Sequence, residues 1–481
     1  MSARAPEPSC PAASQDEKMI SRKSALMKVL PAAAGSFVEW YEFGMYSLLT
    51  PYITSNFFAG RGGSLGTWSG FAITFLFRPL GGAFFGWLAD RCGRKPAMQL
   101  TILTMFVATI AQGCLPSFTC CGDWGWLGLV LLLLLRALQG LSGGGEIATA
   151  VVYMSEVAPK ESLGWCISWL SFFGDSGAAF VASLVILAFE STLSKEAMHD
   201  WGWRVVYLTS IFPGLALVFL RRNLEETIEF TSVLVEADKE EVARHAEEGS
   251  GMDASAKLAI GKLNPMEELF AHHKLAMVVG SLGIAGIGAY TYVVPLYGPL
   301  FIERFDKLPP SAVTLSRMTG SVLQMGIVNL SSRLIDTWGV GKVHMLGVFV
   351  CAVATPLPLF YWWTHVPQEQ AIAAVFVGQI ILSILTSLSI TVYLWVVELF
   401  PVRVRVTGMG IAYNIGLSIF GGLGPVLSEV GNRVISPRGI VSAPAAYTLV
   451  FGIIILGTVA ASRVLSRYGL LQLTHVRDEP Y

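Results

Sequence analysis

The chain has 481 residues, of which 53% are hydrophobic and only 14% are charged, and its mean hydropathy is +0.58. Soluble domains carry about 25% charged residues, so this composition excludes an ordinary soluble fold and indicates a membrane protein. The net charge of −1 gives no reason to expect a nucleic-acid partner. The seven cysteines are scattered, which favours small buried side chains over a metal or redox site.

Residues 1–28 are polar and lack a short apolar core followed by a small-residue cleavage site. We therefore predict a retained tail over residues 1–30 and no secretory signal. Twelve apolar stretches follow, each near the roughly 20 residues that a membrane-spanning helix needs. They lie near 31–53, 67–89, 97–115, 126–150, 164–188, 203–220, 275–299, 313–335, 343–364, 370–396, 407–429 and 442–464.

This pattern predicts an all-α integral membrane protein with two six-helix bundles, at residues 31–220 and 275–465. The polar stretch 221–274 holds 7 basic and 12 acidic residues. A solvated linker with one short surface helix is favoured there over a regulatory platform. Residues 466–481 are predicted to form a second tail.

The positive charges are distributed unevenly. If both termini are cytoplasmic, the segments on that side hold 23 Lys and Arg, the opposite segments hold 8, and the membrane interior holds two, Arg78 and Arg136. The positive-inside rule then predicts cytoplasmic termini. A multi-pass protein of the cell membrane is expected.

Two short motifs recur at similar offsets. Gly86–Gly93 closes the second span and Leu334–Gly339 closes the eighth, 246 positions later, while Glu156–Pro159 and Glu398–Pro401 follow the fourth and tenth spans at an offset of 242. The repeats indicate duplicated six-span units related by an axis along the membrane normal, with a solute site at their midplane interface. Duplication of this kind predicts alternating access.

The motif GWLADRCGRK at 86–95 resembles the loop signature of the major facilitator superfamily. Six further motifs resemble the metabolite:proton symporter branch of that superfamily, and the resemblance covers nearly all of residues 31–465. They are FVEWYEFGMY at 37–46, FLFRPLGGAFFG at 75–86, RALQGLSGGGE at 136–146, WGWR at 201–204, RRNLEET at 221–227 and ELFPVRVRVTGMGIAYNIG at 398–416.

The resemblance implies proton-coupled uptake of organic acids, betaine, proline or similar polar solutes. The chain departs from the branch at Glu42, where an aspartate is usual. The Gly-Pro-rich fifth-helix signature of drug antiporters is missing from residues 171–184, which argues against efflux.

Ionisable side chains within the spans mark the candidate site. A charge at mid-bilayer depth costs about 2.5–3.5 kcal/mol and normally turns toward a partner or a wet cavity. At 100° per residue, Glu39, Glu42 and Tyr46 share one stripe of the first span. The proton-coupling candidates are Glu39, Glu42, Glu146 and Asp175. The alternatives are a static ion pair that locks helices for Glu39 and Glu42, and a cap in a Gly-rich kink for Asp175.

A second stripe, on the fourth span, is expected to line the cavity and consists of Arg136, Gln139, Gly143 and Glu146. The run Gly143–Gly145 is interpreted as a close helix contact and not as a phosphate loop. Arg78 and Arg136 are candidates to receive a substrate carboxylate through their planar donors, with neutralisation of a buried acid as an equal alternative. The other substrate-binding candidates are Gln139, Tyr46, Tyr290, Tyr393, Tyr413 and Asn414.

The second half has the opposite chemistry. Spans seven, ten and eleven carry no charged residue in their cores, only neutral side chains that also include Tyr292, Tyr297 and Gln379. We expect the first half to handle charge and ion coupling, and the second half to supply neutral hydrogen bonds and aromatic walls.

The gating candidates lie in the loops that the repeat identified, and they are Asp90, Arg91, Gly93, Arg94, Glu156 and Glu398. The resemblance implies that Asp90 faces the amino end of span eleven near Thr407 and Gly408, where a carboxylate gains about 0.3–1 kcal/mol. A simple topology signal is the alternative. The second-half loop at 332–342 lacks the repeated arginines, which leaves its gating role open.

The sequence thus predicts a secondary active transporter that couples a small polar solute to protons. The alternatives are a sugar-type facilitator that ignores protons and a membrane receptor without turnover. The spans contain no metal cluster, nucleophile triad or HExxH pattern, so an enzyme is not expected. The expected partners are the solute, protons and the lipid bilayer, with no cofactor, no metal and a monomeric chain.

Overall fold

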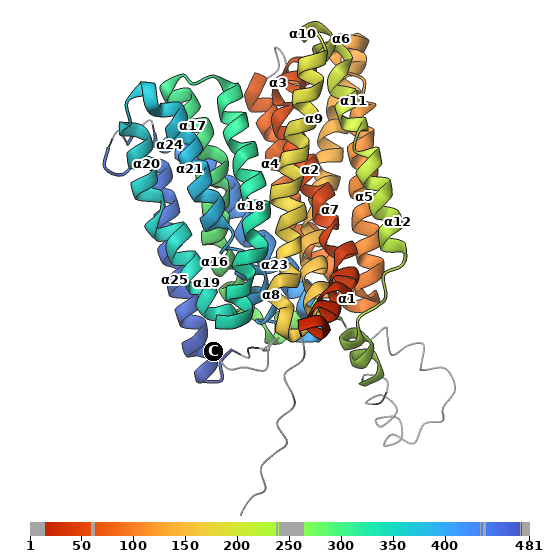
Figure 1. Cartoon of the computed structure of the whole chain (residues 1–481). Helices are drawn as coiled ribbons and strands as arrows, with labels where there is room; N and C mark the ends of the chain where they lie inside the picture. The colour runs from red at the N-terminus through yellow and green to blue at the C-terminus, as the bar shows by residue number, and fades with distance from the viewer. Residues whose placement is uncertain are drawn as a thin grey trace, which may run out of the picture.

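The computed structural model describes residues 15–58, 63–236, 239, 264–432, 434–435, 439–471 and 473. Each regular element in these ranges is helical. Figure 1 shows α1 to α12 as one group of helices and α15 to α25 as a second group beside it. Helix α1 begins and helix α25 ends at one end of the molecule, which we call the terminal end. The opposite end is called the far end.

The first bundle runs from α1 to α12. Its elements are α1 (Gln15–Ala33), α2 (Gly35–Leu48), α3 (Thr50–Ile53), η1 (Thr54–Phe58), α4 (Gly63–Cys92), α5 (Arg94–Gly113), α6 (Phe118–Cys121), η2 (Gly122–Trp124), α7 (Gly125–Val157), η3 (Lys160–Ser162), α8 (Leu163–Ser171), η4 (Phe172–Ala178), α9 (Ala179–Thr192), α10 (Lys195–Ala197), η5 (Met198–Gly202), α11 (Trp203–Leu208) and α12 (Ile211–Arg222).

The second bundle runs from α15 to α25. Its elements are α15 (Pro265–His272), α16 (Lys274–Thr291), η6 (Tyr292–Tyr297), α17 (Gly298–Asp306), α18 (Pro310–Trp338), α19 (Val340–Val348), η7 (Phe349–Ala354), α20 (Pro356–His365), η8 (Gln368–Gln370), α21 (Ala371–Thr386), α22 (Thr391–Val397), η9 (Val402–Val404), α23 (Arg405–Ile415), η10 (Gly416–Gly421), α24 (Gly422–Gly431) and α25 (Ala443–Arg467).

Ten helical runs in the described residues are long and apolar enough to cross a membrane, by length and composition alone. The predicted first and eighth spans fall outside this set. Helix α2 has only 14 residues and two of them are glutamates, while α18 is rich in hydroxyl and amide side chains. Both helices run alongside the others in Figure 1. The all-α membrane fold is confirmed, and the arrangement agrees with twelve spans.

The amino-terminal region differs from the predicted tail. Helix α1 begins at Gln15, and its apolar Ala25 and Val29 are buried where α1 packs on α7 and α8. These two residues lie one turn apart, so they present one face to the bundle. The short helix predicted within 235–248 lies mostly outside the described residues.

The cysteines also differ in part from the prediction. Cys120 and Cys121, neighbours on α6 at the far end, form a disulfide with each other. Cys166 and Cys351 are buried, as expected for small apolar side chains, whereas Cys92 and Cys114 are exposed.

Glycines allow α4 to approach α7 and α23 closely. A methyl group on Gly144 would collide with the carbonyl oxygen of Arg78, which confirms that the Gly143–Gly145 run serves close packing within the first bundle. Between the bundles, a Cβ on Gly410 would lie 2.5 Å from the carbonyl oxygen of Gly82. The two bundles therefore meet backbone to backbone at the α4–α23 contact.

Several spans contain a π-helical turn, a feature that is common at functional sites. The turn η4 includes Gly174, whose φ of −73° and ψ of −106° depart from helical values. Ser36 of α2 lies against this glycine, and its hydroxyl donates to the carbonyl of Leu170 at 2.9 Å. The resulting bend sets the position of Asp175, the next residue.

Candidate functional site

A cavity of about 140 Å³ lies between the two bundles. It is lined by residues of α2, η4, α9, α16, η6, α18 and α21, so both halves of the chain contribute to its wall. Its polar and aromatic wall comprises Trp40, Phe43, Ser47, Asp175, Ser183, Thr291, Tyr292, Arg317, Ser321, Gln324, Gln379, Ser383 and Thr386. A cavity at the interface of the repeats agrees with the position predicted for a solute site.

The first ionic pair behind this wall is Glu39 with Arg78. Arg78 Nη2 donates to Glu39 Oε1 at 2.6 Å, and both side chains are almost completely buried. Arg78 Nε also donates to Asn414 Oδ1 at 3.3 Å. Asn414 in turn donates to the carbonyls of Gly144 and Gly410 at 2.7 and 2.6 Å. This chain of contacts connects the first bundle to α23 of the second.

The second pair is Glu42 with Arg136, and it lies wholly within the first bundle. Arg136 donates through Nη1 to Glu42 and to Gln139 Oε1, and its guanidinium lies 3.9 Å from the ring centroid of Tyr46. Gln139 Nε2 donates to the Thr109 hydroxyl at 3.0 Å. Arg136 Nε and Nη2 have no hydrogen-bond partner among the described residues. Arg136 is thus hydrogen-bonded through Nη1, while its other two nitrogens are left without an acceptor in the described residues.

Glu146 lies about 15 Å along α7 from Arg136, since ten residues separate them. It pairs with Arg221 of α12 through both carboxylate oxygens and accepts a hydrogen bond from the Thr101 hydroxyl at 2.6 Å. The stripe from Arg136 to Glu146, which was expected to line the cavity, is buried inside the first bundle instead. Spacing along a helix shows which residues share a face, but it does not show whether that face is turned toward the cavity or toward neighbouring helices.

The predicted tyrosines of the second half are packed more than exposed. The Tyr290 hydroxyl is 2.8 Å from that of Thr386, a residue of the cavity wall. The rings of Tyr393 and Tyr413 lie 5.9 Å apart, and Tyr413 is buried. Tyr46 is also buried, beneath Arg136. Of the candidate residues for coupling or substrate binding, Asp175 belongs to the wall of this cavity, and so do Tyr292 and Gln379, two of the neutral side chains that the second half was expected to supply.

The terminal end is closed by contacts between the bundles. Asp90 accepts hydrogen bonds from the backbone N–H of Val406 and Thr407, at 3.2 and 2.8 Å, and from the Thr407 hydroxyl at 2.7 Å. This is the contact with the amino end of span eleven that the family resemblance implied, and it is confirmed. Gly93, at the end of the same loop, has a φ of +110°, which favours glycine.

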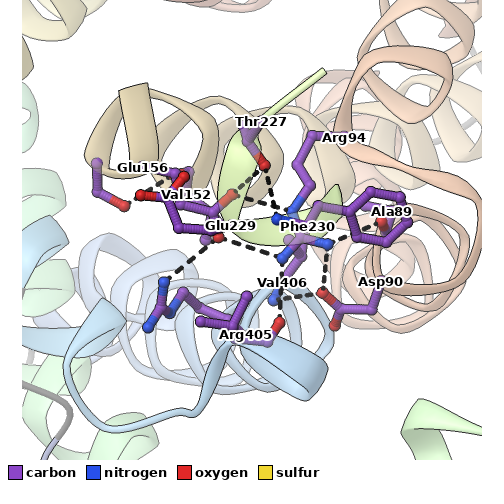
Figure 2. Close-up of polar contacts among 12 residues, drawn as sticks. Ala89, Asp90, Arg94, Val152, Glu156, Thr227, Glu229, Phe230, Arg405 and Val406 are labelled. Atoms are coloured by element: carbon purple, nitrogen blue, oxygen red, sulfur yellow. Dashed lines mark hydrogen bonds and ion pairs between the residues drawn. The ribbon is translucent and has the colours of Figure 1, made fainter. Parts of the chain in front are cut away.

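Figure 2 shows Glu156 between two arginines at this closure. Arg94 donates to both oxygens of Glu156 at 3.2 Å, and Arg405 of the second bundle lies 3.3 Å from the same carboxylate. Arg94 Nη2 also donates to the carbonyl of Val402 at 3.0 Å. Among the other predicted gate residues, Arg91 stacks on Trp87 and Glu398 is buried at the end of α22.

The segment after α12 packs onto the same closure, as Figure 2 also shows. The Glu226 carboxylate accepts from the backbone N–H of Arg94 at 3.0 Å, and Thr227 donates to Glu156 at 2.7 Å. The Arg94 guanidinium lies 4.7 Å from the ring centroid of Phe230. Partial burial raises the pKa of Glu229 above its ordinary value. The start of the central segment is thus part of the closure.

A second closure mirrors the first. Asp336, at the end of α18, accepts from the backbone N–H of Gly164 and Trp165 at 2.8 and 3.3 Å, at the start of α8. Asp90 and Asp336 occupy corresponding places in the two repeats, and each carboxylate binds the first turn of a helix in the other bundle. The gating role that the sequence left open for this loop therefore has a structural basis that does not need the repeated arginines.

Most residues of the cavity wall have no feature in the sequence that marks them as binding residues. Arg317 was counted with the segments outside the membrane, although it lies seven residues inside α18 and lines the cavity. Trp40, Phe43 and Gln324 were not singled out either, because aromatic and amide side chains in a span carry no distinctive signal. Their spacing on predicted spans one and eight was the available clue. In the described residues, no group of three or more His, Cys, Asp or Glu side chains is arranged to hold a metal ion.

Comparisons with known proteins agree with this architecture. The family model described as Sugar (and other) transporter matches residues 28–466. The ectoine/proline transporter ProP of Corynebacterium glutamicum is 30% identical over 452 residues, which cover 91% of this chain and 84% of that protein. The glycine betaine/proline/ectoine/pipecolic acid transporter OusA of Dickeya dadantii is 27% identical, over 91% of this chain and 83% of that protein.

Among solved structures, the major facilitator proton:xylose symporter XylE bound to 6-bromo-6-deoxy-D-glucose aligns with a TM-score of 0.72 and 14% identity, over 95% of this chain and 99% of that chain. This likeness shows the fold. Two six-helix bundles with a cavity between them define a membrane transporter of the major facilitator type. The chain belongs to the Sugar (and other) transporter family of that superfamily.

Proposed function

We propose that this chain is a proton-coupled symporter that carries a small polar organic solute, a carboxylate or a zwitterion, across the cell membrane by alternating access. The observation that carries the proposal is the position of the two buried Glu–Arg pairs, directly behind a cavity that both bundles line. Charges at such depth are retained where ions or protons move. Relatives named as proline, betaine and ectoine transporters support the solute class.

The coupling step follows from the Glu39–Arg78–Asn414 chain. A proton bound to Glu39 removes the negative partner of Arg78, which is also bonded across the bundle interface to Asn414. The α2–α4 contact then loses its ion pair, while Arg78 stays charged and keeps its hydrogen bond to Asn414 of α23. Protonation therefore leaves a buried arginine without its carboxylate at the contact between the bundles, and this change in charge balance couples proton binding to their rearrangement. Glu42 and Arg136 supply a second site of the same kind.

The orientation is part of the proposal. The terminal end is assigned to the cytoplasm because the segments predicted on that side hold 23 of the basic residues against 8 on the other. The conformation described here is then closed toward the cytoplasm by Asp90, Asp336 and Glu156. Transport into the cell requires these closures to open.

The proposed function is tested in proteoliposomes with labelled glycine betaine or proline. An inward proton gradient of one pH unit stores about 1.4 kcal/mol per proton, so one-to-one symport is expected to accumulate solute up to about tenfold. A facilitator that ignores protons would stop at equal concentrations. A receptor without turnover would give no counterflow of labelled solute.

The closure at the terminal end supports a separate prediction. Replacing Asp90 with alanine removes three hydrogen bonds to the start of α23. Hydrogen bonds to a charged group contribute about 1.5–3 kcal/mol, so we expect the ratio of closed to open protein to fall by roughly tenfold or more. Spin labels at the exposed Lys160 and Lys342 report this as a longer mean distance. The exposed Asp123 changed to alanine is the control, and an unchanged distance in the Asp90 variant would refute the gating role.

A further inference from the structure

One face of α18 and the bend in span five bring opposite charges to the same cavity. Arg317, Gly320, Ser321 and Gln324 all line it, and their spacing of three, four and seven residues places them on one side of the helix. At the end of this face that lies near the middle of α18, Gln324 Nε2 donates to Asp175 Oδ2 at 2.9 Å. Asp175 therefore lies level with Gln324, two turns along α18 from Arg317.

Arg317 has no hydrogen bond and no ion pair in the part of the chain that the structure describes, and it is only partly buried. The acidic neighbour whose charge acts on it is Glu303 of α17. None of the Arg317 nitrogens is among the buried side-chain atoms that lack a hydrogen-bond partner, so its five donors remain accessible to a solute in the cavity. Its planar pair of donors matches a carboxylate, which is the chemistry of a solute-binding group.

Asp175 is arranged differently. Its Oδ1 accepts from the Ser171 hydroxyl at 2.5 Å, and its Oδ2 accepts from Gln324. Both oxygens already hold a hydrogen bond, yet the carboxylate has no basic partner among the described residues. Each oxygen has a second lone pair, so the carboxylate offers a cation both negative charge and further acceptor positions, and the groups around it decide which class of cation binds.

Aromatic rings complete the negative end. Trp40 and Phe43 of α2 line the cavity with a ring separation of 5.7 Å, and Tyr292 of η6 lies 6.2 Å from Phe43. Alkylated ammonium groups bind on the faces of such rings because the ring quadrupole attracts a cation that cannot donate hydrogen bonds. The rings and Asp175 together form a receptor for that class of cation.

The separation of the two poles fits a small zwitterion. Seven residues of α18 span about 10.5 Å. In an α-amino acid the nitrogen lies about 2.5 Å from the carboxyl carbon. With a polar contact of about 3 Å at each end, such a molecule bridges roughly 8–9 Å, which the flexible Arg317 side chain can adjust. A dicarboxylate would place a negative group against Asp175, and a diamine would place a positive group against Arg317.

We propose that Asp175 and Arg317 are the two poles of the solute site, with the alkylated ammonium of a zwitterion at Asp175 and its carboxylate at Arg317. The inference rests on the proposed function and narrows it from carboxylate or zwitterion to zwitterion. It also gives Asp175 a binding role beside the cavity, whereas Glu39 and Glu42 keep the coupling role behind its wall.

The test is calorimetric binding to the purified full chain, without any gradient, using three matched probes. Glycine betaine carries both charges, 3,3-dimethylbutanoate replaces its nitrogen with carbon, and choline lacks the carboxylate. The unaltered protein is expected to bind glycine betaine at least tenfold more tightly than either half-charged probe. Equal binding of all three probes would overturn the proposal.

Single substitutions at Asp175 or Arg317 should change which of the three probes the protein binds most tightly. Asp175→Asn is expected to weaken glycine betaine binding at least tenfold and to strengthen 3,3-dimethylbutanoate binding. Arg317→Gln is expected to weaken glycine betaine binding by the same factor and to strengthen choline binding. Lys307→Gln, on the exposed turn before α18, is the matched control and should change nothing. Loss of glycine betaine binding with no gain for either probe would overturn the proposal.

Asp175→Glu and Arg317→Lys replace the main variants if those do not fold, as judged by thermal melting. Each keeps its charge and is expected to keep the order of the three probes, and a reversed order would contradict the assignment. The result is separable from the proposed function. If the two variants change their probe preference as expected but a pH gradient drives no uptake, the assignment of the solute site is supported and proton symport is refuted. If a pH gradient drives uptake but the variants keep the original probe preference, proton symport is supported and the assignment of the solute site is refuted.

Discussion

Changing Glu39 or Glu42 to glutamine is expected to abolish accumulation of solute by a pH gradient while leaving exchange of solute intact. The unaltered protein should reach up to about tenfold accumulation per pH unit, and each variant should stop near an inside-to-outside ratio of one. Uptake into proteoliposomes with an inward proton gradient measures the first quantity. Counterflow of labelled solute at equal pH measures the second.

The physical reason is that glutamine keeps the size and the hydrogen-bonding ability of the side chain but cannot exchange a proton. In the Glu39 variant Arg78 permanently lacks a negative partner, so its contact with Asn414 no longer depends on pH. In the Glu42 variant the same holds for Arg136. The solute still reaches the cavity, because neither glutamate belongs to its wall.

A matched control is Glu190→Gln. Glu190 is exposed at the end of α9, where it accepts a hydrogen bond from Tyr52 at 2.8 Å, and its change should leave accumulation at the unaltered value. If both Glu39→Gln and Glu42→Gln still accumulate solute tenfold, the two pairs are static helix locks and coupling lies elsewhere. Loss in only one variant would assign the coupling proton to that residue.

The sequence was sufficient to find the buried charges but not to pair them. Glu39, Glu42, Arg78 and Arg136 stand out because each is an ionisable group within an apolar stretch. Which acid meets which arginine depends on how α2, α4 and α7 rotate about their axes, and helical spacing contains no information on rotation. For the same reason Glu146, on the stripe with Arg136, could not be told apart from a cavity residue.

The gate was predicted better than the cavity, for a reason that particular residues make clear. Asp90 belongs to a contiguous motif, and the resemblance of that motif to a known family implies its long-range contact with the start of α23. The cavity wall takes between one and five residues from each of seven helical elements, so no contiguous motif describes it. Arg317 lies so near the start of its span that charge counting assigned it to the loop.

Replacing Arg221 with methionine is expected to destabilise the protein more than any other single change considered for the first bundle. Arg221 is fully buried and donates to Glu146, to the carbonyls of Pro31 and Met98 at 3.1 and 2.6 Å, and to that of Ala32 at 3.2 Å. Removing one partner of a buried pair costs about 3–5 kcal/mol because the other charge remains without compensation. Thermal unfolding in detergent should show a melting temperature lower by roughly 3–5 °C for a chain of this length.

The double variant Arg221→Met with Glu146→Gln separates structure from coupling at this pair. It removes the uncompensated charge, so it is expected to recover much of the lost stability, although the three carbonyls stay without their donor. Glu146→Gln alone should retain pH-driven accumulation, because Glu146 lies about 15 Å along α7 from Arg136 and is enclosed by Thr101 and Arg221. If instead Glu146→Gln loses accumulation while Arg221→Met melts normally, Glu146 exchanges protons during transport, and the pair with Arg221 opens in a conformation other than the one described.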